Sequence, residues 1–235
     1  MISALDWHPV SNLLLSCSVD RGIIVWENDG KNNFAPQMGV VKEKMANLDA
    51  SWNMRGDKYC VGSSSGHVYV GKYYADNNFW VAHSVKGKPI HKASVVCVRF
   101  DPLSSRAVVS ASLDGSVMIT SAFYEDVDSI STEGPFGSVS TFGENLHSIS
   151  SNTWINGLAF SPNSKILSYV THDCEINFVD VTECGTESKN KPKSEKVLHK
   201  GNPHMNCLFI DDQTLIASGF DKIPYIYKLN GSEWK

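Results

Sequence analysis

Short apolar stretches of four to six residues alternate with turns along the whole chain. Within many of these stretches apolar and polar residues alternate, which is typical of strands with one buried face. No window shows the sustained i, i+3, i+4, i+7 spacing of an amphipathic helix. The pattern therefore predicts an all-β protein.

The same plan of three strands occurs five times, with repeats that start near residues 2, 46, 94, 154 and 204. The first strand of each repeat ends on an aromatic residue, and a tight turn follows. A second strand of β-branched and small residues leads to another turn, which holds an aspartate in four of the five repeats, and a third strand closes the unit. The aromatic anchors are Trp7, Trp52, Phe100 and Phe160, with Phe209 in the fifth repeat, and the turn aspartates are Asp20, Asp114, Asp173 and Asp221.

Successive anchors lie 45, 48, 60 and 49 residues apart. A period of this length with several strands in each unit is typical of a β-propeller blade. We therefore expect one propeller domain over residues 1–235, in which the anchors pack each blade against its neighbour. Candidate fourth strands run from Gln37 to Lys42, from Phe79 to Lys86, from Leu146 to Ser150 and from Glu195 to His199.

The longest interval contains a polar segment rich in glycine and serine, and residues 122–151 are predicted to be an insertion between strands. Phe136 and Phe142 lie within it. Aromatic residues in such a loop either contact a partner or fold back onto the domain. Phe79 and Trp80, at the start of a candidate outer strand, leave the same two alternatives open. These four aromatic residues are the candidate partner-binding residues.

Composition excludes several classes of protein. Of the 235 residues 42% are hydrophobic and 20% are charged, and no apolar run is long enough to cross a membrane. The formal net charge of -4 offers no basic stripe for nucleic acid. The first residues lack the features of a secretion signal, which predicts a cytoplasmic protein. The six cysteines show no paired spacing and are expected to be reduced and buried.

No group of residues predicts catalysis or a cofactor. The turn aspartates belong to different blades, where aspartate suits a turn by accepting bonds from nearby backbone N–H groups. His199 and His204 have a spacing seen at zinc sites, but Gly201 and Pro203 interrupt any helix that would align them. Motifs for a nucleophilic serine or a phosphate-binding loop do not occur. We expect neither a metal nor an enzyme.

The repeats resemble WD repeats, whose terminal tryptophan occurs here once, as Trp26. The segments between them are more specific. KPIHKASVVCVRFDP from Lys88, PFGSVSTFGEN from Pro135 and IASGFDKIPYIYK near the end resemble subunit 1 of the actin-related protein 2/3 complex. This resemblance implies a seven-bladed propeller in a seven-subunit assembly, which binds the side of an actin filament and nucleates a branch.

Only five of the seven implied repeats are visible, and the family's long arm before the last blade is absent. The chain begins directly before a first strand and ends at Gly231–Lys235, where the fourth strand of the fifth blade is expected to start. We therefore expect a partial chain or an isoform with two exposed apolar blade faces.

The resemblance implies a non-enzymatic scaffold subunit at the actin cytoskeleton, whose partners are the other subunits and, through the complex, the actin filament. A generic WD-repeat adaptor that binds short peptides in another cytoplasmic assembly is the alternative. A propeller enzyme would need clustered acids or metal ligands at the central channel, which the sequence does not offer.

Overall fold

A computed structural model describes residues 1–31, 33–129, 133–184 and 192–235 of the chain. Regular structure in these residues consists of twenty β-strands. The described part contains no helix with the length and hydropathy of a membrane-spanning segment. The predicted all-β fold class is confirmed.

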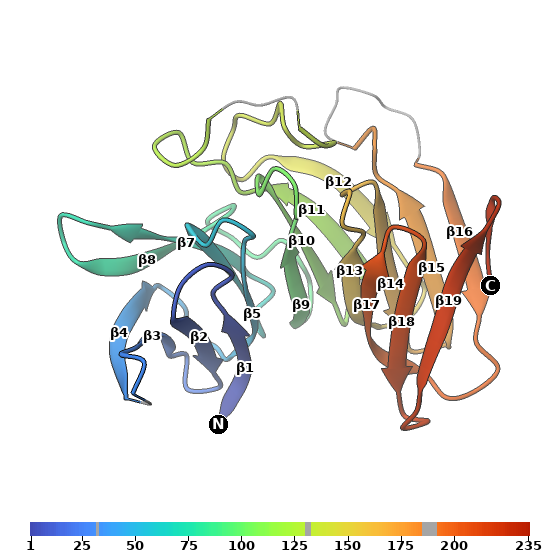
Figure 1. Cartoon of the computed structure of the whole chain (residues 1–235), viewed down its shortest axis with the longest axis horizontal. Coiled ribbons are helices and arrows are strands. Elements are labelled where there is room, and N and C mark those ends of the chain that lie inside the picture. The colour runs from blue at the N-terminus through green and yellow to red at the C-terminus, as the bar shows by residue number, and fades with distance from the viewer. Residues whose placement is uncertain (32, 130–132, 185–191) are drawn as a thin grey trace.

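The strands form five consecutive four-stranded antiparallel blades, which follow one another along an arc (Figure 1). Packing between blades joins each blade to the next one in the chain, mainly through the first strands β1, β5, β9, β13 and β17. In Figure 1 the first and last blades lie at the two ends of the arc.

The first strands begin close to the five predicted repeat starts. Blade 1 consists of β1 (Ile2–Trp7), β2 (Leu13–Ser18), β3 (Ile23–Asn28) and β4 (Phe34–Val41). Blade 2 consists of β5 (Asn47–Trp52), β6 (Lys58–Ser63), β7 (Val68–Tyr74) and β8 (Phe79–Ser84). Blade 3 consists of β9 (Val95–Phe100), β10 (Ala107–Ser112), β11 (Ser116–Ser121) and β12 (Asn145–Ser150). Blade 4 consists of β13 (Ile155–Phe160), β14 (Ile166–Thr171), β15 (Glu175–Asp180) and β16 (Ser194–Leu198). Blade 5 consists of β17 (His204–Asp211), β18 (Thr214–Gly219), β19 (Pro224–Asn230) and β20 (Glu233–Trp234).

The fourth strand of blade 5 was expected to start at Gly231–Lys235, and the structure contains the two-residue strand β20 there. β20 pairs with β19 through Leu229 and Trp234. The Trp234 ring stacks on Phe178 of blade 4, with ring centroids 3.9 Å apart, and its backbone N–H donates to Glu195. The apolar area that this indole buries explains why such a short strand is held in place.

Blades 1 and 2 are joined more closely than the other blades. Their outer strands β4 and β8 pair in parallel, with Gly39 opposite Trp80 and Val41 opposite Ala82, so that the two blades form one eight-stranded sheet. A Cβ atom at Gly39 would lie 2.9 Å from Ile23 and 3.0 Å from the Tyr59 hydroxyl. The absence of a side chain at this position allows the close approach.

The core lies between the blades. Four clusters of buried apolar side chains each join two consecutive blades. Four anchors face the preceding blade and are buried: Trp52, Phe100, Phe160 and Phe209.

Trp7 was expected to be a buried anchor, and this prediction is wrong, because 56% of the residue is exposed. Trp7 occupies the same position in blade 1 as Phe100 does in blade 3. No described blade lies against that face of blade 1. The indole lies beside Phe34 of its own blade, with ring centroids 6.3 Å apart.

Candidate interaction surface

The insertion in blade 3 occupies residues 122–144, between β11 and β12, and lies along the top of the arc in Figure 1. Its described residues are fixed to blades 2, 3 and 4. Because loops held by a rigid scaffold commonly carry binding residues, this segment is the first candidate for a partner surface.

The start of the insertion is tied to blade 2 by a buried ion pair. Asp128 accepts bonds from the Lys58 ammonium group at 2.7 and 2.9 Å, and both side chains have no exposed area. Lys58 also donates to the carbonyl oxygens of Ser105 and Ala122, at 2.7 and 3.1 Å. Burial lowers the pKa of Lys58, although the Asp128 charge opposes this shift. The remaining Asp128 bonds come from Arg55 and from the Tyr124 backbone N–H.

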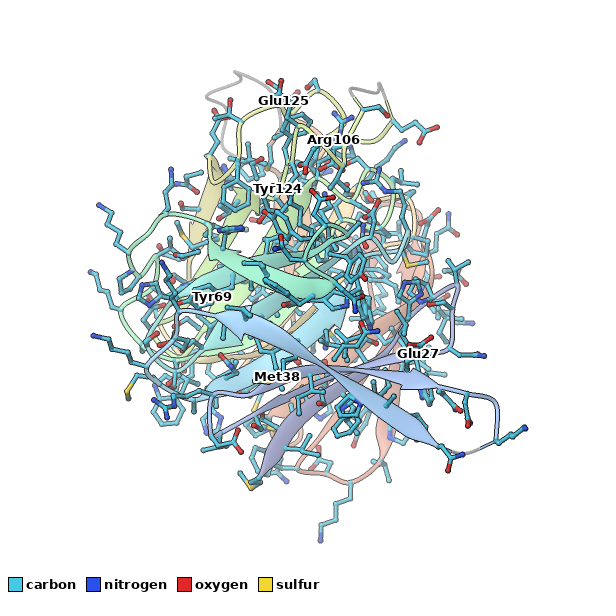
Figure 2. The ribbon with its side chains drawn as sticks, turned by 90° about the vertical axis from the view of Figure 1, so that its left-hand side faces the viewer. Glu27, Met38, Tyr69, Arg106, Tyr124 and Glu125 are labelled. Atoms are coloured by element: carbon cyan, nitrogen blue, oxygen red, sulfur yellow. The ribbon has the colours of Figure 1, made fainter. Side chains whose placement is uncertain are left out.

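A second contact to blade 2 lies beside the first. The Tyr124 hydroxyl donates to the Val70 carbonyl oxygen at 2.9 Å. Lys72 lies over the rings of Tyr74 and Tyr124, 4.7 and 4.8 Å from their centroids, and pairs with Asp126. Burial raises the pKa of Tyr124 above its usual range. Tyr124 and the neighbouring exposed Glu125 are both labelled in the upper part of Figure 2.

The middle of the insertion folds back onto the domain. Phe136 is fully buried in the cluster between blades 3 and 4, where its ring lies 6.2 Å from that of Phe160. Arg106, also buried, donates to the carbonyl oxygens of Gly137 and Val139. Of the two alternatives for Phe136, the structure therefore has the one in which the ring packs on its own domain, and this side chain is not available to a partner.

The other three candidate residues are placed differently. Phe142 is half-buried and stacks on Tyr124, with ring centroids 4.8 Å apart. Phe79 is half-buried in β8. Trp80 is buried among Trp52, Tyr59 and Tyr73, and its indole N–H donates to Gln37 at 3.3 Å. Phe79 and Phe142 thus keep part of their rings at the surface.

A hollow of about 450 Å³ lies where blades 1 and 2 meet the insertion. Its walls include the apolar groups of Leu13, Tyr73 and Trp80, together with Val127 of the insertion. The exposed Glu27, labelled in Figure 2, lies at the same hollow. Periodicity could not have revealed this hollow, because the inserted residue that lines it comes from an irregular segment.

The four turn aspartates lie apart in separate blades and bond to groups near them. Asp20 accepts from the Gly22 N–H, and Asp114 accepts from the N–H groups of Lys92 and Ser116. Asp173 accepts from the Thr171 hydroxyl. Asp221 accepts from the Asn202 N–H at 2.9 Å and bonds to His199 at 3.0 Å. Bonds of this kind stabilise turns.

The two histidines with zinc-site spacing, His199 and His204, lie close together, with ring centroids 4.3 Å apart. His199 and His204 both bond to the Tyr227 hydroxyl, at 3.1 and 2.8 Å. Within the described ranges, no three histidine, cysteine or acidic side chains are grouped so that they could hold a metal ion. All six cysteines are free, and burial raises the pKa of Cys97 and of Cys207 to about 12. Such thiols are poor nucleophiles.

Two segments of the chain match the model of a known protein family. The family model for the WD domain, G-beta repeat, matches residues 1–27 and 83–121, which include β1, β2, all but the last residue of β3, and β9 to β11. The matched segments are similar to WD repeats, and the fold of the chain is an all-β propeller.

The propeller is similar to curated proteins from a plant, a frog and a yeast. It is 28% identical over 228 residues to actin-related protein 2/3 complex subunit 1A of Arabidopsis thaliana, covering 97% of this chain and 58% of that protein. It is 26% identical over 230 residues to subunit 1A-B of Xenopus laevis, covering 96% of the chain and 59% of that protein. It is 25% identical over 236 residues to subunit 1 of Saccharomyces cerevisiae, covering the whole chain and 58% of that protein.

These similarities confirm the resemblance identified in the sequence. They extend through the insertion and the outer strands, which the repeat model does not match. The propeller spans a little under three fifths of the length of these relatives.

Proposed function

We propose that the chain is a non-enzymatic scaffold subunit of an actin-related protein 2/3 complex and supports the nucleation of branched actin filaments. The proposal rests on one observation: similarity to the proteins named as subunit 1 of that complex covers 96 to 100% of the chain. A general WD-repeat protein would share mainly the repeat positions. The alternative of an adaptor in another assembly is therefore not favoured.

The proposed partners are the other subunits of the complex and, through them, the actin filament, which places the chain in the cytoplasm at the actin cytoskeleton. The structure supports a role in binding rather than catalysis. Its buried charged groups, such as Lys58 and Asp128, are bonded to each other and to the backbone, and they hold the insertion on the blades. A rigid loop on a rigid propeller is suited to recognition by surface complementarity.

Phe142 and Phe79 are the residues that we propose for partner contact, together with the exposed edge of the insertion around Glu125. Partly exposed aromatic residues commonly anchor interfaces. Trp80 is assigned a supporting role, because its buried indole fixes Gln37 beside the hollow between blades 1 and 2. Phe136 is assigned to the core.

The experiment is to express the tagged full chain in its native cell type, purify it at moderately high salt and identify co-purifying proteins by mass. We expect both actin-related proteins and the small subunits in stoichiometric amounts. The Glu125→Lys variant should reduce this recovery, whereas Met54→Glu, at an exposed site in a turn of blade 2, should not. Recovery of unrelated partners, or of chaperones alone, would refute the proposed function.

A further inference from the structure

The hollow between blades 1 and 2 combines aromatic side chains from blade 2 with a glutamate from blade 1. The rings of Tyr73 and Trp80 line it, with centroids 5.3 Å apart and planes tilted by 53°. Tyr73 is 40% exposed, so part of this aromatic wall is open to a ligand. Leu13 and Glu27 line the hollow from the side of blade 1.

Two of the charged side chains at the hollow are already paired with groups that do not line it. The Lys72 ammonium group pairs with Asp126 of the insertion. The Asp57 carboxylate pairs with the Arg55 guanidinium group, with 2.9 Å between nitrogen and oxygen. The charges of Lys72 and Asp57 are therefore compensated within the chain, and neither is left for a ligand.

The imidazole of His8, which also lines the hollow, carries no charge in this structure. Its Nδ1 atom accepts bonds from two backbone N–H groups of the following turn, at 3.1 and 3.0 Å, so this nitrogen holds no proton. The proton is then on Nε2, which donates to the Gly56 carbonyl oxygen at 2.9 Å. A neutral His8 does not offset the negative charge of a nearby carboxylate.

The Glu27 carboxylate has no cationic partner in the described part of the chain. It accepts one long bond, from the Gln37 side-chain amide at 3.4 Å. The Gln37 side-chain oxygen in turn accepts from the Trp80 indole N–H at 3.3 Å. Gln37 therefore links the carboxylate to the aromatic wall, and the hollow offers one uncompensated negative charge close to two rings.

A guanidinium group matches this combination of a carboxylate and aromatic rings. It is planar and weakly hydrated, so it can pair with the carboxylate and lie against the rings at the same time. We propose that the hollow binds an arginine side chain of a partner protein, with the guanidinium group at Glu27 and the apolar stem against Leu13 and Trp80. The inference does not depend on the proposed function, because it concerns the side chain that the hollow accepts and not the assembly that supplies it.

The test titrates the full chain with three small probes, the Nα-acetyl amides of arginine, citrulline and lysine. Citrulline has nearly the shape of arginine but no charge. Binding is followed by the NMR shift of the Trp80 indole N–H, which is assigned from its loss in Trp80→Phe. The same titrations are made with Glu27→Gln, which should fold because Glu27 is exposed. Glu144→Gln, an exposed glutamate of the insertion that does not line the hollow, is the matched control.

We expect the arginine probe to bind with a dissociation constant on the order of 1 mM, as is usual for so small a ligand. The citrulline probe should bind about fivefold more weakly, and Glu27→Gln should weaken binding of the arginine probe by about the same factor. The lysine probe should have an intermediate affinity, because its ammonium group keeps the charge but does not stack on the rings. Glu144→Gln should bind the arginine probe like the unmodified chain. Equal affinities for the arginine probe and either other probe, or an unchanged affinity in Glu27→Gln, would overturn the inference.

Discussion

Phe100 in blade 3 and Trp7 in blade 1 hold the same place in their repeats but have different surroundings. Each ends the first strand of its blade and faces the preceding side. Phe100 lies in the cluster between blades 2 and 3 and is 6% exposed, whereas Trp7 is mostly exposed. The contribution of an anchor to stability is therefore determined by the neighbouring blade more than by its own blade, as expected for repeat proteins.

The strongest test of this comparison is to remove each ring. Phe100→Ala should lower the free energy of unfolding by roughly 3–5 kcal/mol, because it removes a buried ring and leaves a cavity between two blades. Trp7→Ala should lower it by less than about 1 kcal/mol, because the ring is already largely in water. Urea denaturation of both variants measures the two values. Equal losses would show that an anchor acts within its own blade.

The sequence predicted the strands well, because each blade repeats the same alternation between turns. The anchors Trp52, Phe100 and Phe160 were assigned from repeat phase alone and are buried. Trp7 could not be distinguished from them in this way, because the exposure of an anchor depends on whether another blade lies next to it. The burial of Phe136 was also open, since a loop aromatic has no periodic partner that fixes its direction.

The pairing of β4 with β8 and the bond between Lys58 and Asp128 had no signal in the sequence. Lys58 and Asp128 are 70 residues apart, and one belongs to a strand while the other belongs to an irregular segment. No local pattern brings such residues together. The strand pairing becomes evident only when blades 1 and 2 are placed side by side, and the ion pair only when blades 2 and 3 are.

The junctions themselves also differ in chemistry. The junction between blades 4 and 5 is made by apolar side chains such as Phe178, Phe209 and Trp234. The junction between blades 2 and 3 contains, in addition to its apolar cluster, the buried pair of Lys58 and Asp128. Removing one member of a buried ion pair leaves the other charge uncompensated, which costs more than the pair itself contributes.

Asp128→Ala should therefore lower the free energy of unfolding by about 3 kcal/mol. We expect a value at the lower end of the usual range because Lys58 keeps its bonds to the Ser105 and Ala122 carbonyl oxygens. The double variant Lys58→Met with Asp128→Leu should be less destabilised than the single one, as urea denaturation can measure. If the single variant proved as stable as the double one, the unpaired Lys58 charge would not affect the stability of this junction.

The blades also differ in the hydrogen-bond partner of the serine in the second strand. In blade 1 Ser16 accepts a bond from the Trp26 indole at 2.8 Å, and neither side chain titrates near neutral pH. In blade 3 the equivalent Ser110 bonds to His91 at 2.7 Å. The other nitrogen of the buried His91 ring bonds to Ser116 at 2.6 Å and lies 3.8 Å from Asp114. Of these two networks, the one in blade 3 therefore couples folding to pH.

Burial lowers the pKa of His91 to about 4, although Asp114 opposes this shift. Between this value and the ordinary 6.5 the unfolded chain binds the proton more readily, so the stability that neutral His91 provides is lost as pH falls. We expect the free energy of unfolding to fall by about 2 kcal/mol from pH 7 to pH 5 from this residue alone, since one pKa unit corresponds to 1.36 kcal/mol.

Urea denaturation at both pH values tests this expectation. The free energy of unfolding should depend less on pH in His91→Gln than in Trp26→Phe, the matched control, which removes an uncharged bond in blade 1. Burial also lowers the pKa of His83, His147 and His204, so the free energy of unfolding of the unmodified chain should fall by more than this amount. The difference in pH dependence between the two variants isolates the contribution of His91. The same slope in both variants would mean that His91 is protonated in the folded chain, with its charge balanced by Asp114.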